Sequence, residues 1–525
     1  MMISKSKIFL AILSAAYLIL AYPNFNLEFL AWAGLVPLFF AIENKSAFQA
    51  FLMSYLTGVI FFLGTVYWLI HVTLPGMIIV VLYLALYFGF FGMIISRQRV
   101  AKSQGYMTLF FVPALWVALE LLRSRLFGGF GWCLLGHSQS YTLPVIQIAD
   151  MTGAYGVSFL VMTVNTAIFL TVKNFRKNNT FFPYLMAAVF LVLLCLTYGI
   201  FRMNNIFTGE RLRVCVIQGN IPQSKKWDAG SREEILAKYT SLTRRSAQEH
   251  VDLVIWPETS VPGFLESERS LSDRITSLAQ EIKTPMLVGA PGEEIKPKET
   301  YYNSAILVSE DGSMMDRYNK IHLVPFGEYV PLKNVLSFVE RFARSPIGDF
   351  VPGNDYTVFK FIVERRVKDK ETSWRLLKKA KFSCLICFED IFPDLTRQFV
   401  KRGAAFLVNI TNDAWFGRTS AAYQHAQSSV FRAVENRVNV VRAANTGLSC
   451  FIDQKGRITG AVESNGENLF VDGFKIGEIT LAATGTFYTR FGDLFAYLCA
   501  LFALVLILSK NKFIQKILEP LWTIA

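Results

Sequence analysis

The chain has 525 residues, of which 53% are hydrophobic, 14% aromatic and only 18% charged. This composition is too apolar for an ordinary soluble protein, and the length is too great for one compact domain. The formal net charge of +13 does not indicate nucleic acid as a partner, because much of the positive excess lies in short loops between apolar segments. The seven cysteines are an odd number without regular spacing, which excludes a disulfide scaffold.

Seven apolar runs follow one another closely up to about residue 200, and an eighth comes after a long polar region. Each run has close to the ~20 residues that cross a bilayer as an α-helix. For the first run a cleaved signal peptide is the alternative, because two lysines precede it, but further runs follow at once and no clear A-x-A site is present. The predicted transmembrane helices lie at roughly 7–22, 25–42, 49–71, 76–96, 106–123, 154–172, 181–200 and 491–509.

The lysine and arginine residues between these runs predict the orientation of the helices. With the N-terminus in the cytoplasm, the inside loops carry positive charge and the outside loops at 23–26 and 71–76 carry none. The fifth loop, with Arg123 and Arg125, departs from this bias. Both termini are then cytoplasmic, and residues ~205–490 lie on the outer side. The positive residues assigned to the inside are Lys5, Lys7, Lys45, Arg97, Arg99, Lys102, Lys173, Arg176, Lys177, Lys510, Lys512 and Lys516.

Residues 128–140 (GGFGWCLLGHSQS) interrupt the apolar pattern with glycines and aromatic residues. Irregular backbone of this kind is tolerated at membrane depth where protein or water covers it. A re-entrant or interfacial segment at the outer surface and a simple loop are equal alternatives for this stretch.

From residue 208 to 482 the pattern changes to alternating strands and helices, which favours a layered α/β domain. We therefore divide the chain into a transmembrane bundle of seven helices (1–204), an extracytoplasmic α/β domain (205–490) and a C-terminal helix with a cytoplasmic tail (491–525). The highly charged run 361–381 is predicted to be a solvated surface excursion without an assigned function.

Three apolar strands of this domain end in residues that suit catalysis. VIWPETSVP (254–262) leads to Glu258, YNKIHLVPFGEYVP (318–331) contains Lys320, and KFSCLICFED (381–390) ends in Cys387. A cysteine near pH 7 is only a few per cent thiolate, so it needs a base or a nearby positive charge to become a nucleophile. A partly buried Glu258 suits the role of base, and Lys320 suits neutralisation of an oxyanion, with the backbone N–H of Phe388 as a second donor.

Each of these residues also has a structural interpretation. Cys387 alone is more often a structural thiol, and Glu258 and Lys320 alone are more often an ion-pair partner and a surface lysine. The C-x-x-C spacing of Cys384 and Cys387 places the two thiols on opposite faces of a strand, and no second such pair completes a zinc site. His322 and His425 are predicted to be structural, and no phosphate-binding glycine motif is present, so we predict neither metal nor cofactor.

Together the motifs WPE, NK-x-HLVPFGE and C-x-x-C-F-E-D resemble the Glu–Lys–Cys triad of the nitrilase (carbon–nitrogen hydrolase) superfamily. The stretches 412–417 (NDAWFG), 425–427 (HAQ) and 440–447 (VVRAANTG) extend the resemblance. A nitrilase-like domain between the seventh and eighth of eight spans is similar to the apolipoprotein N-acyltransferase family over nearly the whole chain. The soluble motifs carry the specificity, and the membrane half matches in layout.

This resemblance implies an αββα nitrilase sandwich joined to a membrane bundle of about eight helices, in the bacterial inner membrane with the catalytic domain on the periplasmic side. Cys387 would take an acyl group from a phospholipid as a thioester and pass it to the α-amine of a diacylglyceryl-cysteine on an apolipoprotein. Glu258 would be the general base and Lys320 would hold the oxyanion.

The resemblance also implies supporting residues. Glu328 would position Lys320 or the incoming amine, Glu389 would support the nucleophile, and Trp227 and Trp415 would contact lipid. The family often has tyrosine after the cysteine, whereas Phe388 keeps the ring and lacks the hydroxyl.

Two other functions compete with acyl transfer to lipoproteins. One is a membrane-tethered amidase or nitrile hydrolase acting on small substrates with the same triad. The other is a receptor or scaffold built on a degenerate nitrilase domain, against which the intact triad argues.

Overall fold

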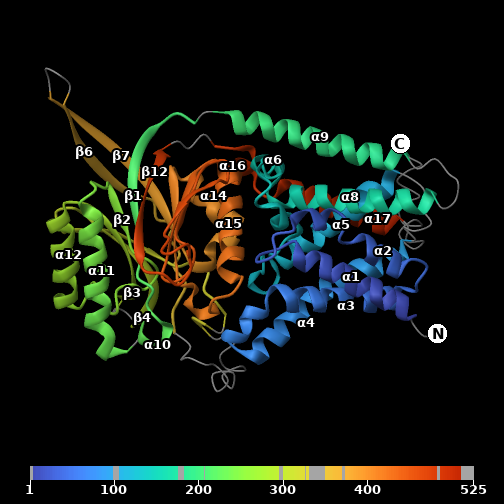
Figure 1. Cartoon of the computed structure of the whole chain (residues 1–525), viewed down its shortest axis with the longest axis horizontal. Coiled ribbons are helices and arrows are strands. Elements are labelled where there is room, and N and C mark those ends of the chain that lie inside the picture. The colour runs from blue at the N-terminus through green and yellow to red at the C-terminus, as the bar shows by residue number, and fades with distance from the viewer. Residues whose placement is uncertain are drawn as a thin grey trace, which may run out of the picture. The chain divides into compact units, whose positions relative to one another are not determined.

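A computed structural model describes residues 4–98, 106–175, 182–205, 207–226, 228–294, 299–325, 327–329, 349–368, 373–481 and 485–509 of the chain. The chain divides into two compact units, each drawn in Figure 1. The helical unit comprises Met1–Tyr67, Pro75–Asn204 and Phe491–Ala525, and the α/β unit comprises Trp68–Leu74 and Asn205–Arg490.

Four helices among the described residues are long and apolar enough to cross a membrane. Their side chains are almost all apolar and uncharged. A helix also pairs its own backbone N–H and C=O groups, as a segment buried in lipid requires. These four are α3 (Ala47–Thr65), α4 (Leu74–Arg97), α8 (Ala154–Phe175) and α9 (Phe182–Asn204).

The predicted count of eight spans is matched only in part. The predicted span 25–42 is split into a 3-10 turn, η1 (Glu28–Trp32), and a short helix, α2 (Val36–Ile42), which restarts with Pro37 in its first turn. Proline suits that position because its missing N–H has no helical partner there. Within the described part of the chain, the remaining predicted spans correspond to helices that are not both long enough and apolar enough to be counted with these four. They stay predictions: α1 (Lys5–Leu20), α5 (Tyr106–Arg123) and α17 (Leu494–Ser509).

The glycine-rich segment 128–140 is packed into the helical unit. It contains a 3-10 turn, η4 (Leu135–Gln139), whose five residues are all buried. Arg123 on α5 donates to the carbonyl of Trp132 at 2.8 Å, and Glu120 on the same helix accepts from the N–H of Leu135 at 2.7 Å. Polar side chains of α5 therefore satisfy the irregular backbone, as buried backbone groups require.

The α/β unit contains two six-stranded sheets among the described residues, with strand orders β12-β1-β2-β3-β4-β5 and β11-β10-β9-β8-β7-β6. The first sheet is built from β1 (Glu210–Gln218), β2 (Leu253–Ile255), β3 (Met286–Glu294), β4 (Thr300–Val308), β5 (Met314–Asn319) and β12 (Gly473–Leu481). The second is built from β6 (Phe359–Lys368), β7 (Ser373–Ile386), β8 (Phe406–Thr411), β9 (Asn439–Ala444), β10 (Cys450–Ile452) and β11 (Ile458–Ala461).

The sheets pack face to face, with β1 against β9 and β4 against β7, and helices cover both outer faces (Figure 1). Helices α11 (Arg232–Ala247) and α12 (Arg269–Ile282) cover the first sheet, and α14 (Pro393–Lys401) and α15 (Ala421–Asn436) cover the second. The apolar positions of α11 lie three or four residues apart, so they form one face, which packs with Trp256 in the core. The predicted αββα sandwich is therefore present.

The described residues of the charged run 361–381, which we predicted to be a solvated surface excursion, lie in strands β6 and β7. Residues 359–368 and 373–382 pair as an antiparallel hairpin, with Phe359 opposite Phe382 and Lys368 opposite Ser373 (Figure 1). Backbone pairing continues along strand β7 because its far end is fixed in the second sheet by parallel pairing with β8. The charge of the run obscured this continuity in the sequence.

The carboxyl ends of parallel strands create the place where the predicted catalytic residues lie. Strands β1, β2 and β3 are parallel in the first sheet, and β7, β8 and β9 are parallel in the second. Gly289 on β3 lies directly against the segment that leaves β2. A Cβ atom at this glycine would meet the carbonyl oxygen of Pro257, the amide nitrogen of Thr259 at 2.7 Å and the Cα of Glu258 at 2.8 Å.

We expect Gly289→Ala to destabilise the α/β unit, because the added methyl group meets backbone atoms that cannot rotate away. Overpacking of this kind costs about 1–3 kcal/mol, which the apparent unfolding temperature of the detergent-purified protein would report. Gly292→Ala on the same strand is the control, since the one close approach of its Cβ would be to the rotatable hydroxyl of Ser304, and its next neighbours lie at 3.4 Å or more. Equal unfolding temperatures for the two variants would contradict the expectation.

Candidate active site

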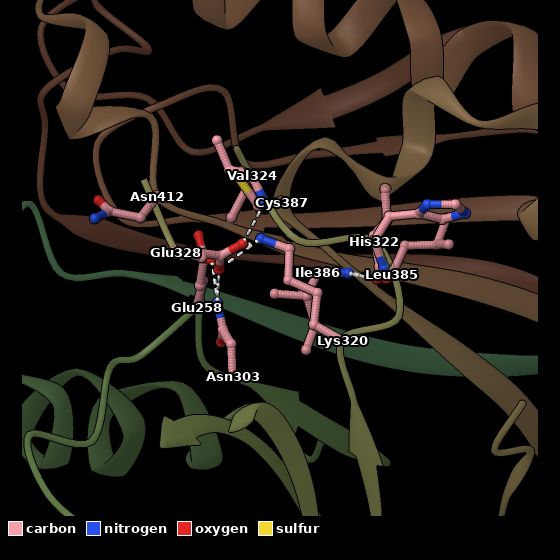
Figure 2. A network of polar contacts seen from close by, with 12 residues as sticks. Glu258, Asn303, Lys320, His322, Val324, Glu328, Leu385, Ile386, Cys387 and Asn412 are labelled. Carbon is pink, nitrogen blue, oxygen red and sulfur yellow. Dashed lines mark hydrogen bonds and ion pairs between the residues drawn. The ribbon is translucent and has the colours of Figure 1, made fainter. Parts of the chain in front are cut away.

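The three predicted catalytic residues come together within the α/β unit. Glu258 lies three residues beyond β2, Lys320 directly follows β5, and Cys387 directly follows β7. Their exposed fractions are 6%, 1% and 7%, so all three side chains are nearly withdrawn from water. Figure 2 shows the ammonium of Lys320 between the carboxylates and the thiol of Cys387.

A polar network fixes the carboxylates around Lys320. The Nζ atom of Lys320 lies 2.8 Å from Oε1 of Glu328 and 3.6 Å from Oε1 of Glu258. The Nδ2 atom of Asn303 on β4 lies 2.7 Å from the same two carboxylate oxygens, and the N–H of Val324 donates to Oε2 of Glu328 at 2.8 Å. Glu328 therefore holds Lys320 in place beside Glu258, as Figure 2 shows.

The neighbouring side chains keep Lys320 positively charged. Burial by itself would lower the pKa of Lys320, but Glu328, Cys387 and Glu258 outweigh burial and raise that pKa above its ordinary value. Lys320 is therefore an ammonium at any physiological pH and is suited to stabilise negative charge that develops beside it.

The thiol of Cys387 is protonated at rest. Burial raises its pKa well above the ordinary value, Glu258 raises it further, and Lys320 lowers it only in part. A base must therefore remove the proton during reaction, and a carboxylate of this network can accept it. A thiol, a carboxylate and an ammonium arranged in this way can transfer an acyl group through a thioester.

The backbone at this centre is strained. Cys387 has a φ of 56° and Thr259, next to Glu258, has a φ of 43°. Such left-handed conformations cost roughly 1–3 kcal/mol each for residues other than glycine, and they persist where the surrounding structure enforces them. At Cys387 this conformation turns the chain from β7 into the 3-10 turn η7 (Cys387–Ile391).

Glu389 ties the turn after β7 to the turn after β5. Its carboxylate is fully buried and accepts from the N–H groups of Ile386, Ile321 and His322 and from the hydroxyl of Tyr318, at 2.7–3.0 Å. Burial raises the pKa of Glu389 to about 7, although these donors pull it down. One side chain therefore fixes the spacing between Cys387 and Lys320.

One side chain from β8 and one from α15 hold the carbonyl group of Cys387. The carbonyl oxygen of Cys387 accepts from Nδ2 of Asn409 at 2.8 Å and faces Nε2 of His425 at 3.2 Å. These contacts orient the following peptide group, whose N–H belongs to Phe388. They provide a physical reason for the strained φ of Cys387.

His425 belongs to a buried cluster of four charged side chains. Its Nε2 lies 2.9 Å from Asp390 and its Nδ1 lies 2.9 Å from Asp413, while Arg442 lies 2.7 Å from Asp390. Burial would lower the pKa of His425, but the two carboxylates raise it to about 9. His425 is therefore an imidazolium at neutral pH, which agrees with the structural role predicted for it.

The other predicted site residues lie in different places. Phe388 carries its ring 5.4 Å from Nζ of Lys320, so the aromatic face is retained although the hydroxyl is absent. Trp415 lies half-buried in the 3-10 turn η8 (Asp413–Phe416). Trp227 lies outside the described residues.

The sequence motifs did not identify two further residues of the centre. Asn303 points inward from β4, and a polar residue inside the apolar stretch YYNSAILVS is the signal that marks it. Lys226, at the end of α10 (Gln223–Lys226), is buried and donates to the carbonyl oxygen of Glu258 at 2.8 Å. Its only signal is its place in the KKWD motif. Among the residues that the structure describes, no group of three or more histidine, cysteine or acidic side chains is arranged to hold a metal ion.

The fold and the centre define a nitrilase-type domain, and residues 213–486 match the family described as carbon-nitrogen hydrolase. Residues 14–167 match the family described as apolipoprotein N-acyltransferase N-terminal domain. The two matches together cover both units of the chain.

Relatives extend this similarity to nearly the full length. The apolipoprotein N-acyltransferase of Geobacter metallireducens is 40% identical over 517 residues, covering 95% of this chain and 94% of that protein. The enzyme of the same name from Chlorobaculum tepidum is 30% identical, covering 94% of each chain. That from Pasteurella multocida is 29% identical, covering 96% of this chain and 95% of that protein.

The chain belongs to the apolipoprotein N-acyltransferase family. The resemblance inferred from the strand-end motifs is thereby confirmed, together with the predicted class of enzyme, an acyltransferase of lipoprotein maturation.

The charge of His425 predicts how stability depends on pH. Its pKa is raised in the folded protein from an ordinary value near 6.5 to about 9, so its stabilising contribution is complete below 6.5 and is lost as the pH rises through 9. We expect the unfolding temperature to fall across this interval, by the equivalent of a few kcal/mol. His425→Gln should be less stable at pH 6 and should lose less stability between pH 6.5 and 9.

His250→Gln, which removes an exposed histidine, is the control and should keep the pH dependence of the unmodified protein. Parallel pH curves for His425→Gln and the unmodified protein would show that His425 is not the group that titrates.

Proposed function

We propose that Cys387 carries the acyl group between two half-reactions, from a membrane phospholipid to the α-amine of a diacylglyceryl-cysteine at the N-terminus of an apolipoprotein. The observation that supports this assignment is the buried centre in which Glu258, Lys320 and Cys387 meet at the ends of three strands. Family membership supports the reaction, and this geometry supports the chemical role that we propose for each residue.

In the first half-reaction Glu258 takes the proton of Cys387, and the sulfur attacks the carbonyl carbon of the sn-1 ester. The oxyanion that forms is stabilised by Lys320 and by the N–H of Phe388, where each donor is worth about 3–4 kcal/mol of the barrier. As the C–O bond breaks, Glu258 returns its proton to the leaving glycerol oxygen. The products are a lysophospholipid and a thioester on Cys387.

In the second half-reaction the neutral α-amine of the lipoprotein attacks the thioester carbonyl. Glu258 accepts a proton from the attacking nitrogen, and the same donors stabilise the second oxyanion. The C–S bond breaks because a thiolate leaves readily, and Glu258 reprotonates the sulfur. An amide and the free thiol of Cys387 result, so no cofactor is consumed.

The supporting residues act through these three. Glu328 keeps Lys320 aimed at the reacting carbonyl, and Glu389 keeps the turns that carry Lys320 and Cys387 at a fixed distance. Phe388 supplies its N–H and an aromatic face. Trp415, and Trp227 from the sequence alone, are assigned to lipid contact.

The burial of the centre favours acyl transfer over hydrolysis. Cys387 is only 7% exposed, and a site that excludes water protects a thioester until the amine arrives. A membrane-tethered amidase would instead need an open pocket for small amides and would release ammonia from them without phospholipid. A non-catalytic scaffold would tolerate Cys387→Ala in a cell that lacks the native protein.

The cellular arrangement completes the proposal. Residues 1–204 form the transmembrane bundle, 205–490 the catalytic domain on the periplasmic side of the inner membrane, and 491–525 the last helix and a cytoplasmic tail. The four candidate spans and the placement of lysine and arginine support this arrangement. A periplasmic site has no ready supply of ATP or acyl-CoA, so a phospholipid in the same membrane is a suitable acyl donor.

We expect Cys387→Ala to abolish the acyl adduct that forms when the purified protein is incubated with labelled phospholipid, because no other atom replaces the sulfur. Intact-protein mass spectrometry measures the adduct directly. Cys384→Ala is the matched control, since this thiol is buried inside β7 and has a pKa raised by burial, and it should retain most of the adduct.

An adduct that persists in Cys387→Ala would remove the basis of the assignment. Ammonia release from small amides, with no adduct from phospholipid, would favour the amidase instead.

A further inference from the structure

A second buried lysine lies at the catalytic centre and has no task in the reaction as described. Lys226 is 4% exposed, and its Nζ donates to the backbone carbonyl of Glu258 at 2.8 Å. It also lies close enough to the carboxylate of Glu258 and to the thiol of Cys387 for each to raise its pKa. A buried ammonium is costly, so its position beside the general base needs an explanation.

The charges around Lys320 supply that explanation. Glu258 and Glu328 share one ammonium, that of Lys320, and one amide donor, Nδ2 of Asn303. Two carboxylates that share their donors in a largely buried site repel each other. Glu328 has the shorter contact with Lys320, 2.8 Å against 3.6 Å, so Glu258 is the carboxylate that receives less support.

Lys226 also lines a cavity of about 400 Å³, together with other charged groups. Arg232 is paired with Glu268, and Asp228 is bonded to Ser231 and to the N–H of Gly230. Asp349 also lines this cavity. The hydrogen bond of Lys226 itself is made to Glu258, on the side of the catalytic centre.

We propose that Lys226 is the counter-charge that keeps Glu258 ionised and therefore able to act as the general base. Lys226 adds a second ammonium beside Glu258, and without it Glu258 and Glu328 would share the ammonium of Lys320. Lys226 is a positioning residue that acts through Glu258, and the proposal rests on the function assigned to Glu258 above.

The protonation state of Lys226 suits this role. Burial lowers its pKa to about 8, while Glu258 and Cys387 oppose that change. Lys226 is therefore mostly an ammonium below pH 8.

The test compares variants that separate charge from hydrogen bonding. Lys226→Gln keeps a donor and removes the charge, and Lys226→Arg keeps the charge. Lys225→Met is the control, because Lys225 is the neighbouring residue but has a half-exposed side chain that pairs with Glu234. Two rates are measured against pH on the full-length protein in detergent: formation of the Cys387 adduct from phospholipid, and alkylation of Cys387 by iodoacetamide.

We expect the acid limb of both profiles to move up by about one pH unit in Lys226→Gln, because the uncompensated carboxylate takes up a proton more readily. Lys226→Arg and Lys225→Met should keep the limb of the unmodified protein. Unfolding temperatures confirm that each variant is folded.

A uniform loss of rate in Lys226→Gln, with the acid limb unmoved, would mean that Lys226 only supports the backbone of Glu258, and would overturn the proposal. If the unmodified protein forms no adduct with phospholipid, the proposed function fails, while the alkylation profile still decides the role of Lys226.

Discussion

The proposed catalytic centre depends on one shared ammonium. Lys320 lies between Glu258 and Glu328, and its positive charge offsets their negative charges, so the three side chains can lie largely out of water. Removing one member of such a group leaves the others as unpaired buried charges, which is far more costly than the pair is favourable. The geometry is therefore fixed as a whole.

Around that group the two sheets contribute in different ways. The first sheet supplies Glu258, Asn303 and Lys320 from the ends or the inner face of its strands, and the second supplies the strained turn with Cys387. Glu389 joins the two contributions through donors from both. The cluster of charged side chains around His425 also supports the turn that carries Cys387. The sandwich is thus the means by which residues far apart in the sequence acquire a fixed separation.

The sequence was sufficient to locate the three central residues because each lies at or just beyond the end of an apolar strand. It was not sufficient for Asn303, whose role depends on the pairing of β4 with β3, where it lies opposite Pro291. Nor did it reveal Lys226, because a lysine beside another lysine in a polar stretch has no local feature that predicts burial. Both contacts arise only from tertiary packing.

The same limit explains what the sequence left open about the elements. The charged composition did not indicate the hairpin of β6 and β7, because its backbone conformation depends on the pairing of β7 with β8. Apolar composition alone suggested one span at 25–42, whereas Pro37 begins a new helix within it. Periodicity correctly placed α11 and α12, whose apolar faces are regular.

The helical unit is assembled from chain segments that the α/β unit separates. Helix α17 packs on α5 and α8, and Asp493 just before it pairs with Arg125 beyond α5. During synthesis the partners of α17 emerge long before it does, since the whole of the inserted unit must be translated first. During this interval the surfaces of α5 and α8 that α17 contacts are without this partner, and α17 joins the bundle only after the inserted unit has been made.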